Sequence, residues 1–568
     1  MIIYKVLFSG KEDSMNKRNI PVGVSDFSEI RQNDYYYVDK SELIRELLKT
    51  SIAKVTLIPR PRRFGKTLAM SMLANFFDIR QKNESLFQGL AVSSDSSLCK
   101  EWMNQWPVVF LSLKNIDGLT FSTAYQQLAY EIGLLFEKHK YLLTDEKIGP
   151  AEKELFERLK NRSASEVEVS RSLQFLLQLM TQHYGKSAIL LLDEYDVPLA
   201  KASSNGYYKE MLEIIRAIMI TALKDNPSLC FAVITGCLRI SKESIFTGTN
   251  NFVSDTITDS HLDEYFGFTQ KDVDQLLADT DAQDHADNIK NWYDGYHFGD
   301  FDVYCPWDVM NYLRDLQRNP KALPSSYWKN TSDNAIIRSF IDYAGSSITR
   351  KLETLLSGGY IIQEINENLT YDYLHSSEEN LWSVLYLTGY LTCLKDDTLS
   401  LPARSIALVI PNAEIREIFE TTIIQWFDDS ARSWNRKPLF DSIWAKNCAA
   451  ATEEMNRLLR KNISYHDYKE DFYHAFLAGI FAGAGYTVES NREHGEGRSD
   501  VVVYDSENGR VAVFEIKYAQ TSASLPTACE AALTQIATGM YAQEFEDDYD
   551  QIYCYGIAFF KKRCLIAI

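Results

Sequence analysis

A Gly-Lys-Thr segment between an apolar run and a helical stretch constrains this chain more than any other feature. Residues 55–58 are apolar, Gly65, Lys66 and Thr67 follow them, and residues 68–77 have a helical pattern. Strand, turn and helix in this order make a phosphate-binding loop, because the N–H groups at a helix N-terminus point toward anionic oxygens. In such a loop Lys66 reaches the outer phosphates and the Thr67 hydroxyl holds a magnesium ion. We therefore expect the chain to bind a nucleoside triphosphate.

The loop departs from the usual pattern at its first position. The pattern GxxxxGK[ST] has a glycine five residues before Gly65, where this chain has Arg60 followed by Pro61. The arginines of the loop add positive charge near the expected phosphates. The alternative interpretation is a basic turn before an ordinary helix. The residues expected to contact the nucleotide here are Arg62, Arg63, Phe64, Gly65, Lys66, Thr67 and Leu68.

A second apolar run supplies the acidic half of this site. Residues 188–192 are long enough for a fully buried parallel strand, and Asp193 and Glu194 follow them. Asp193 at the strand end is expected to bind magnesium, and Glu194 to polarise the attacking water. A further strand, 229–234, resembles the one that carries a γ-phosphate sensor beside the Asp strand. Thr235 and Arg239 are its candidates, and a simple turn is the alternative.

The bulk properties limit the classes of protein. A chain of 568 residues exceeds one hydrophobic core, so we expect three domains. The composition, 45% hydrophobic and 24% charged, is ordinary for a globular protein, and no stretch has the length of a membrane span. Nine scattered cysteines without a CxxC pair are typical of reduced thiols in the cytoplasm. The net charge of −19 gives no global attraction for nucleic acid, which would need a local basic groove.

The pattern of elements changes along the chain. Residues 1–20 are expected to form a disordered N-terminal extension, and Met15 is a second candidate start. Residues 21–255 alternate strands with helices, including helices at 121–138, 170–183 and 207–223, which predicts a parallel sheet with helices on both faces. Residues 256–455 are mainly helical and rich in aromatic residues. In their segment 292–299 we weigh a nucleotide-sensing or interdomain contact against a turn that only buries its rings, and favour the second.

The C-terminal part, 456–568, contains a predicted hairpin with paired carboxylates. Strands at 501–504 and 511–517 flank a turn at 505–509. A turn centred on residues 507 and 508 places Asp500 beside Glu515, and the period of two puts Glu515 and Lys517 on one face. Two carboxylates and a lysine at one sheet end are the parts of a magnesium-dependent phosphodiesterase site, in which the lysine positions or deprotonates a water.

Two helices flank this hairpin in the sequence. The first, 468–484, carries Glu470 and His474 one turn apart, and Glu470 is expected to complete the metal site. The second, 531–536, carries Gln535, which is expected to contact the nucleic-acid backbone or the lysine. Each piece has a plain alternative, a solvated strand surface or a structural Asp–Glu pair. The ordered set of helix Glu, Asp, Glu-x-Lys and helix Gln favours the nuclease interpretation.

With both ends in view, the chain resembles bacterial AAA-ATPase-like proteins that carry a C-terminal PD-(D/E)xK nuclease-superfamily domain. The resemblance covers nearly everything after residue 20, including the phrases at 21–27, 37–40, 60–67, 192–196, 292–299, 327–332, 497–500 and 514–517. It implies a P-loop NTPase α/β sheet, a restriction-endonuclease-like α/β domain and ATP binding. The missing loop glycine is then a trait of the family. Ser499 stands where the superfamily has its proline, and the metal ligands remain.

These observations predict an ATPase, expected in the cytoplasm, whose nucleotide state controls a nuclease or nucleic-acid-binding module. ATP and Mg²⁺ are the expected cofactors, and DNA or RNA the expected partner. A role in defence against foreign DNA or in mobile-element biology fits the architecture. The alternative is an ATP-gated regulatory switch, with an inactive nuclease-like domain as a platform for a protein partner or a homo-oligomer. The net charge of −19 favours this alternative, and the intact Asp500, Glu515 and Lys517 favour the nuclease.

Overall fold

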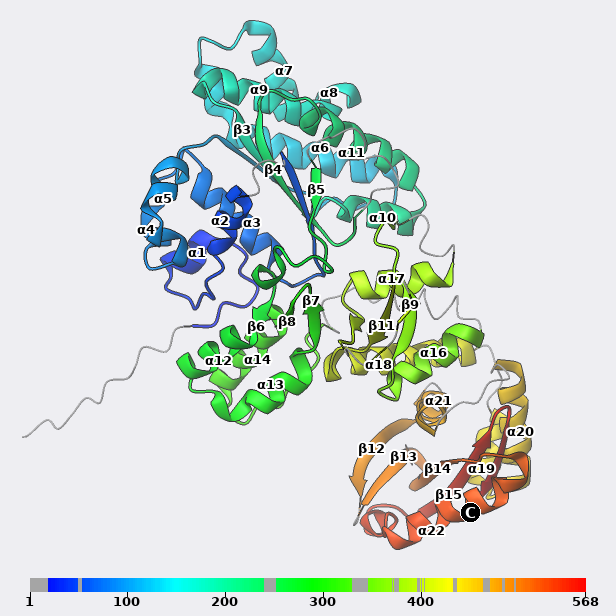
Figure 1. Ribbon diagram of the computed structural model, residues 1–568. Helices are drawn as coiled ribbons and strands as arrows, with labels where there is room; N and C mark the ends of the chain where they lie inside the picture. The colour runs from blue at the N-terminus through cyan, green and yellow to red at the C-terminus, as the bar shows by residue number, and fades with distance from the viewer. Residues whose placement is uncertain are drawn as a thin grey trace, which may run out of the picture.

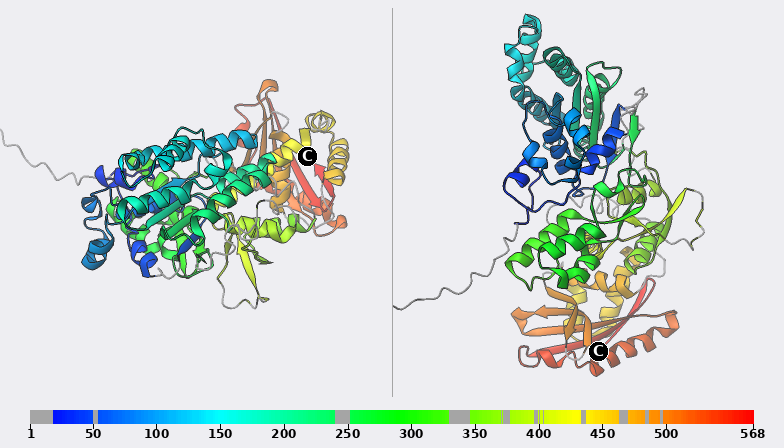
Figure 2. Two further views of the ribbon diagram at one scale, coloured as in Figure 1. Left: turned by 90° about the horizontal axis from the view of Figure 1, so that it is seen from above. Right: turned by 60° about the vertical axis from the view of Figure 1, so that its left-hand side comes forward.

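The computed structural model arranges the chain as a row of three parts (Figure 1). Figure 2 shows the N-terminal and C-terminal sheets at opposite ends, with the middle region between them. The described residues are 19–49, 54–239, 252–328, 346–369, 371, 377–395, 399, 401–402, 404–432, 437–462, 470–482, 486–494 and 497–568. The disorder expected for residues 1–20 therefore concerns a segment that lies almost wholly outside the described residues.

The N-terminal part is built on a five-stranded, entirely parallel sheet in the order β2-β3-β4-β1-β5. Its central strands are apolar and buried along their whole length, as expected of a sheet covered on both faces. β4 lies between β1 and β3, so the strand that ends at Thr235 and Gly236 runs beside the Asp193 strand, as predicted. The strands are β1 (Val55–Pro59), β2 (Val108–Ser112), β3 (Ala188–Asp193), β4 (Leu229–Gly236) and β5 (Phe252–Ser254).

Helices cover both faces of this sheet (Figure 1). The helix predicted over 121–138 has those bounds, and its Thr120 side chain caps the first turn by accepting a hydrogen bond from the N–H of Thr123. The other two predicted helices begin one or two residues later than expected. The helices are α1 (Phe27–Gln32), α2 (Glu42–Lys49), α3 (Lys66–Phe77), α4 (Glu84–Phe87), α5 (Ser96–Trp102), α6 (Phe121–Lys138), α7 (Pro150–Lys160), α8 (Glu166–Ser170), α9 (Ser172–Tyr184), α10 (Val197–Asn205) and α11 (Tyr208–Leu223).

The middle region combines helices with two small antiparallel sheets, β6-β8-β7 and β10-β11-β9, which the sequence pattern did not reveal. These strands have two to five residues each, too short for a visible period of two. The elements are β6 (Phe268–Thr269), α12 (Gln270–Asp279), α13 (Ala286–Tyr293), β7 (Tyr296–Phe298), β8 (Phe301–Tyr304), α14 (Pro306–Arg318), α16 (Ser346–Leu356), β9 (Ile361–Glu364), α17 (Glu378–Leu387), β10 (Thr392–Cys393), β11 (Ser405–Val409), α18 (Ala413–Arg432), α19 (Lys437–Trp444) and α20 (Cys448–Asn462).

The C-terminal part is a mixed five-stranded sheet in the order β12-β13-β14-β15-β16. β13 and β14 form the predicted hairpin, with Val501 opposite Phe514 and Asp505 opposite Arg510. β15 runs parallel to β14, and α21 and α22 pack against the sheet. The elements are α21 (Glu470–Ala482), β12 (Thr487–His494), β13 (Gly497–Asp505), β14 (Arg510–Tyr518), α22 (Leu525–Thr538), β15 (Gln551–Phe560) and β16 (Arg563–Ala567).

Two further expectations concern thiols and membranes. All nine cysteines are free thiols, as their scattered spacing predicted. In the part of the chain that the structure describes, no helix combines the length and the apolar character that a bilayer crossing requires.

Candidate nucleotide and nuclease sites

The loop between β1 and α3 turns sharply at its end. Gly65 has φ 83°, in the left-handed region that suits glycine, and α3 begins at the next residue. The Lys66 ammonium is buried and donates hydrogen bonds to the carbonyl oxygens of Arg60 (3.0 Å) and Pro61 (2.9 Å). It also lies 3.7 Å from the Glu194 carboxylate. The lysine is therefore held by the backbone at the start of the loop, close to the carboxylate that follows β3.

The strand-end aspartate is the centre of a compact polar cluster. Asp193 is fully buried, and its Oδ2 accepts hydrogen bonds from the hydroxyls of Thr67 (3.0 Å) and Ser112 (3.1 Å). Its Oδ1 accepts one from the Thr235 hydroxyl at 2.6 Å. Burial raises the pKa of Asp193, and the hydrogen bonds from Thr235 and Thr67 oppose that rise. A hydroxyl and a carboxylate in contact are oxygen donors of the kind that Mg²⁺ takes, so this pair fits the ion.

Glu194 follows on a strained backbone. Its φ is 55°, an uncommon value for a residue with a side chain, and its carboxylate lies near Lys66 and lines the adjacent cavity. Such outliers gather at functional sites because surrounding structure must hold them in place. The placement is compatible with the water-polarising role expected from the sequence.

Asp196 is a polar residue of this site that the sequence reasoning missed. Its Oδ2 accepts the N–H groups of Cys237 (2.9 Å) and Leu238 (3.0 Å) and the hydroxyl of Tyr371 (2.9 Å), which comes from the middle region. Gly236 permits this approach, because a Cβ there would lie 2.6 Å from Asp196 Oδ1. The signal was present in the sequence as the third acidic residue of the segment Asp193-Glu194-Tyr195-Asp196.

Arg62, expected to contact the nucleotide, and Arg239, a candidate γ-phosphate sensor, differ in what surrounds them. Burial alone lowers the pKa of Arg62, and nearby groups that include Asp196 and Glu194 more than reverse that effect. Arg62 therefore stays a cation beside the acidic residues of the site. Arg239 follows β4 and has its Nε buried without a hydrogen-bond partner among the described residues. The chain beyond it, 240–251, lies outside them.

Arg63 and Phe64 contact the middle region. The Arg63 guanidinium lies 5.5 Å from the ring centre of Trp307 and 5.3 Å from that of Trp328. Phe64 is fully buried, with ring centres 4.9 Å from Tyr296 and 5.0 Å from Phe298. The aromatic segment 292–299 thus buries its rings, the favoured interpretation, and also makes the interdomain contact that was its alternative.

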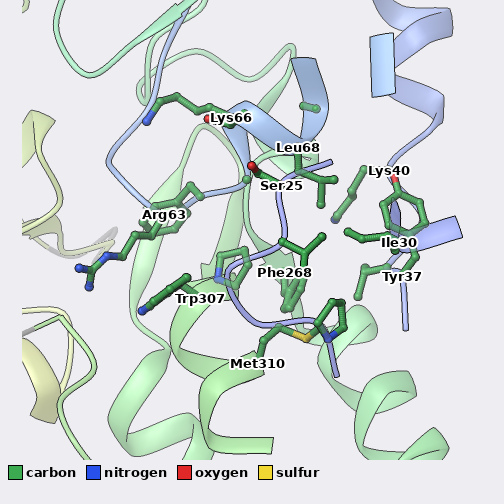
Figure 3. Close-up of a pocket in the computed structure, with 18 of the residues that line it drawn as sticks. Ser25, Ile30, Tyr37, Lys40, Arg63, Lys66, Leu68, Phe268, Trp307 and Met310 are labelled. Carbon is green, nitrogen blue, oxygen red and sulfur yellow. The ribbon is translucent and has the colours of Figure 1, made fainter. Parts of the chain in front are cut away.

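A cavity of about 310 Å³ opens beside the loop (Figure 3). Leu68 lines it from α3, residues 21–25 and Tyr37 line it from the N-terminal segment, and Phe268, Trp307 and Met310 line it from the middle region. In Figure 3 the Arg63 side chain extends past Trp307, away from Tyr37 and Met310. Ligand pockets are mostly apolar with a few polar groups at one end, and this cavity, with the loop at its rim, has that composition.

Two buried carboxyl groups stand behind Arg63. Asp308 on α14 and Glu414 on α18 are both fully buried, and Glu414 accepts a hydrogen bond from the backbone N–H of Trp328 at 2.8 Å. Burial raises the pKa of each carboxyl, and the charge of Asp308 raises that of Glu414 further. Two ionised carboxylates have no donor between them, so a proton on Glu414 completes a hydrogen bond to Asp308. The direction of both pKa shifts favours a proton on Glu414 over two ionised carboxylates.

The hairpin register brings the C-terminal carboxylates together at the sheet end. The ladder of β13 with β14 reaches Val501 and Phe514, the pair next to Asp500 and Glu515. Asp500 Oδ2 accepts a hydrogen bond from the N–H of Ile516 at 2.7 Å, which fixes it across the strand from Glu515. Lys517 Nζ donates to Glu515 Oε1 at 3.0 Å, and Glu515 is buried. Two carboxylates side by side fit a Mg²⁺ ion, since its ligands are oxygens.

The flanking helices place their candidates differently. Glu470 is the first residue of α21, and its side chain lies outside what the structure describes. His474, one turn later, hydrogen-bonds the Asp500 carbonyl and lies 4.0 Å from its carboxylate. Gln535 on α22 donates toward the Tyr541 hydroxyl at 3.5 Å. Among the described residues no three His, Cys, Asp or Glu side chains cluster closely enough to hold a metal ion.

A basic turn lies at the same end of this sheet. Lys561, Lys562 and Arg563 join β15 to β16, with Arg563 opposite Phe560. β15 runs parallel to β14, so the C-terminal ends of both strands lie at the same end of the sheet. Lys517 is near that end of β14. Arg563 is exposed and donates to the Ser522 hydroxyl at 3.4 Å. In a chain of net charge −19 this turn is a local positive group at the same end of the sheet as Lys517.

Two family models match this chain, one over each candidate site. Residues 21–246 match the family model described as a predicted AAA-ATPase, and residues 468–567 match that of the PD-(D/E)XK nuclease superfamily. The matches confirm the layout that the sequence motifs predicted. The chain is also 24% identical over 555 residues to an "uncharacterized protein in vnfD 5′ region" of Azotobacter chroococcum mcd 1, covering 96% of this chain and 97% of that one. That likeness runs across both sites and the region between them.

Proposed function

We propose that this protein binds and hydrolyses ATP in its N-terminal part and that the nucleotide state controls a magnesium-dependent nuclease in its C-terminal part. The observation that carries the ATPase proposal is the contact of Thr67 with Asp193, at the same sheet edge where Lys66 approaches Glu194. Lys66 and Thr67 begin α3, whereas Asp193 and Glu194 lie at the end of β3. The meeting of these four side chains beside a cavity is the arrangement that phosphoryl transfer requires. We place the parts at residues 21–255, 256–455 and 456–568.

In this proposal each side chain of the ATP site has a task. The cavity lined by Leu68 and Trp307 takes the base and ribose, and the N–H groups at the start of α3 hold the phosphates. Lys66 neutralises charge on the outer phosphates, while Glu194 orients the attacking water. Thr67 and Asp193 would hold Mg²⁺, which supplies charge neutralisation at the β- and γ-phosphate oxygens. Arg62, Thr235 and Arg239 are proposed to sense the γ-phosphate.

The nuclease proposal rests on the hairpin. Asp500 and Glu515 would hold Mg²⁺, with Glu470 as the proposed third ligand, and the ion would polarise a phosphodiester. Lys517 then positions or deprotonates the attacking water. Its hydrogen bond to Glu515 keeps its ammonium group beside the carboxylates that would hold the ion. The basic turn at 561–563 supplies a contact for the phosphate backbone of the DNA or RNA. It is the local positive surface that an acidic chain needs for this partner.

A continuous set of contacts supports control of one site by the other. Arg63 packs against Trp328, whose backbone donates to Glu414 at the start of α18. α18 packs against α21, and α21 presents His474 to the backbone of Asp500. A movement of the loop on nucleotide binding is therefore proposed to shift α18 and, with it, the helix beside the nuclease carboxylates.

The second candidate is an ATP-gated switch whose C-terminal domain only binds a partner. The net charge of −19 favours it, because most of the surface repels nucleic acid. Both candidates place the protein in the cytoplasm, in keeping with its free thiols. The two candidates differ in nucleic-acid cleavage, because only the nuclease uses Asp500 to cut the chain.

Paired assays on the full chain test the proposal. ATP turnover and ATP binding are compared between the wild type and Lys66→Ala, and we expect turnover to be lost in the variant. Cleavage of single- and double-stranded DNA and RNA with Mg²⁺ or Mn²⁺ is compared between the wild type and Asp500→Ala. Turnover that survives Lys66→Ala refutes the loop assignment. Loss of cleavage in Asp500→Ala supports the nuclease, and a wild type that binds nucleic acid without cutting it supports the switch.

A further inference from the structure

Arg60 occupies the position at which the usual phosphate-binding loop has glycine, and it is fully buried. One guanidinium nitrogen, Nη2, lies 2.6 Å from the carboxylate of Asp255. The other, Nη1, donates to the backbone oxygens of Asp255 (2.7 Å) and of Pro59 (3.2 Å). A planar guanidinium can serve two acceptors on one residue at the same time, whereas a lysine ammonium cannot reproduce this fork.

The same side chain packs against the middle region. Its guanidinium carbon lies 5.6 Å from the ring centres of both Phe266 and Phe298. Phe298 also contacts Phe64 of the loop, with ring centres 5.0 Å apart. Arg60 therefore joins the ends of β1 and β5 to the aromatic wall that holds the far side of the loop.

The backbone of Arg60 completes the connection to the candidate catalytic groups. Its N–H donates to the carbonyl of Gly236 at 3.0 Å, which ties it to the end of β4 next to Thr235. Its carbonyl accepts a hydrogen bond from the Lys66 ammonium at 3.0 Å. The position of Lys66 is thus set by a residue that the sequence pattern treats as a missing glycine.

We propose that Arg60 is the positioning residue of this ATP site: its buried pair with Asp255 fixes the shape of the loop and the place of Lys66, in the role that a glycine turn has elsewhere. The inference rests on the proposed ATPase function and deepens it. It also makes the loop dependent on the middle region, because Phe266 and Phe298 form part of the pocket that holds Arg60. It reverses the expectation that the arginine adds charge at the phosphates.

The decisive experiment restores the usual glycine. Arg60→Gly completes the pattern GxxxxGKT, so a reading based on the pattern alone expects unchanged or improved ATP binding. We expect at least a tenfold weaker affinity for ATP, measured by equilibrium dialysis with labelled ATP, and a rise in KM. Arg60→Lys keeps the charge without the fork and is expected not to restore affinity. Wild-type affinity and turnover in Arg60→Gly overturn the proposal.

A second variant keeps the test decisive where Arg60→Gly does not fold. Asp255→Asn removes the charge of the partner with little change in shape, and we expect about a fivefold loss of affinity or more, within the range of lost charge-assisted hydrogen bonds. The double variant Arg60→Gly with Asp255→Asn is expected to lose no more affinity than Arg60→Gly alone, because the two residues act as a unit. Unchanged affinity in Asp255→Asn, or additive losses, overturn the proposal.

A matched control separates positioning from general destabilisation. Leu128→Ala removes a buried side chain of α6, away from the loop, and lowers stability without touching the ATP site. At a temperature well below every melting point, its affinity for ATP is expected to equal that of the wild type. The wild type and Lys66→Ala are measured in the same series. If the wild type itself does not bind ATP, the proposed function fails, whereas binding that depends on Lys66 but not on Arg60 removes only this inference.

Discussion

Replacement of Glu414 by glutamine tests the shared proton of the buried carboxyl pair. Glutamine has the shape of a protonated glutamate. Its amide oxygen can still accept the hydrogen bond that the Trp328 N–H donates to Glu414 in the wild type, where the distance is 2.8 Å. Its amide N–H groups can donate hydrogen bonds to Asp308. The variant therefore keeps the hydrogen bonds of the pair and removes only its ability to release a proton. Among the described residues, the Cys305 thiol, the Arg63 guanidinium and the hydroxyls of Tyr293 and Tyr296 also interact with this pair.

The sign of the effect follows from the raised pKa of Glu414. Burial, reinforced by Asp308, lifts its pKa in the folded protein far above the ordinary value of 4.5. Near neutral pH the folded pair therefore holds a proton that the unfolded chain has released. The stability linked to this proton is fully present below the unfolded pKa and is lost progressively as the pH rises toward the folded pKa. The wild type is thus expected to become less stable as the pH rises through neutrality.

The magnitude follows from the number of protons. A difference of one proton changes the free energy of unfolding by about 1.4 kcal/mol per pH unit, or about 2.7 kcal/mol between pH 6 and pH 8. For a region of 150–250 residues this corresponds to a shift of roughly 5–10 °C in melting temperature. Glu414→Gln should match the wild type only near or below the ordinary glutamate pKa of 4.5, and its advantage in melting temperature should grow by about that amount between pH 6 and pH 8.

Differential scanning calorimetry at pH 6, 7 and 8 measures this difference. Glu420→Gln is the matched control, since it changes an exposed glutamate on the same helix and is expected to keep the wild-type pH dependence. Hydrogen exchange across α14 and α18 identifies which transition responds. Parallel pH profiles for the wild type and Glu414→Gln would show that the pair does not retain a proton, and the reasoning from burial would be wrong.

Four further outcomes follow from the two sites. Thr235→Val removes the 2.6 Å hydrogen bond to Asp193 and is expected to lower ATP turnover at least tenfold with a small effect on ATP binding, measured by steady-state kinetics and dialysis. Lys517→Ala should abolish cleavage in a gel assay and leave ATP turnover intact. Arg563→Ala should lower the slope of log affinity against log salt by about one unit for each lost phosphate contact. Chelation by EDTA should stop both activities, and added Mg²⁺ should restore them.

The regular parts of the fold could be predicted because their information is local. The helix over 121–138 has a clear period and a capping Thr120, and its observed bounds are the predicted ones. The hairpin register followed from the turn position and the period of two, which a one-residue slip would reverse. The order of the parallel strands fits the alternation of strands and helices, because crossover connections leave few arrangements.

The loop side chains could not be predicted in the same way. A loop has no repeating geometry, so the sequence did not tell whether Arg63 and Phe64 face phosphates or the middle region. Arg63 contacts Trp307 and Trp328, and Phe64 contacts Tyr296 and Phe298, all of them more than 230 residues away in the chain. The pair of Asp308 with Glu414 was hidden for the same reason, since each acid alone looks like a solvated charge. Ser112 is similar, because its contact with Asp193 arises only when β2 and β3 pair.

The geometry also limits how the two proposed activities can be linked. The N-terminal and C-terminal sheets lie at opposite ends of the molecule with the middle region between them (Figure 2), so we expect the middle region to carry the coupling. The described contacts that cross it run from Arg63 through Trp328 and Glu414 to α18 and α21. Coupling through such a set is reciprocal in its binding free energies. If ATP tightens nucleic-acid binding by a given factor, a bound nucleic acid must tighten ATP binding by the same factor, and Glu414 lies where a substitution would change both factors together.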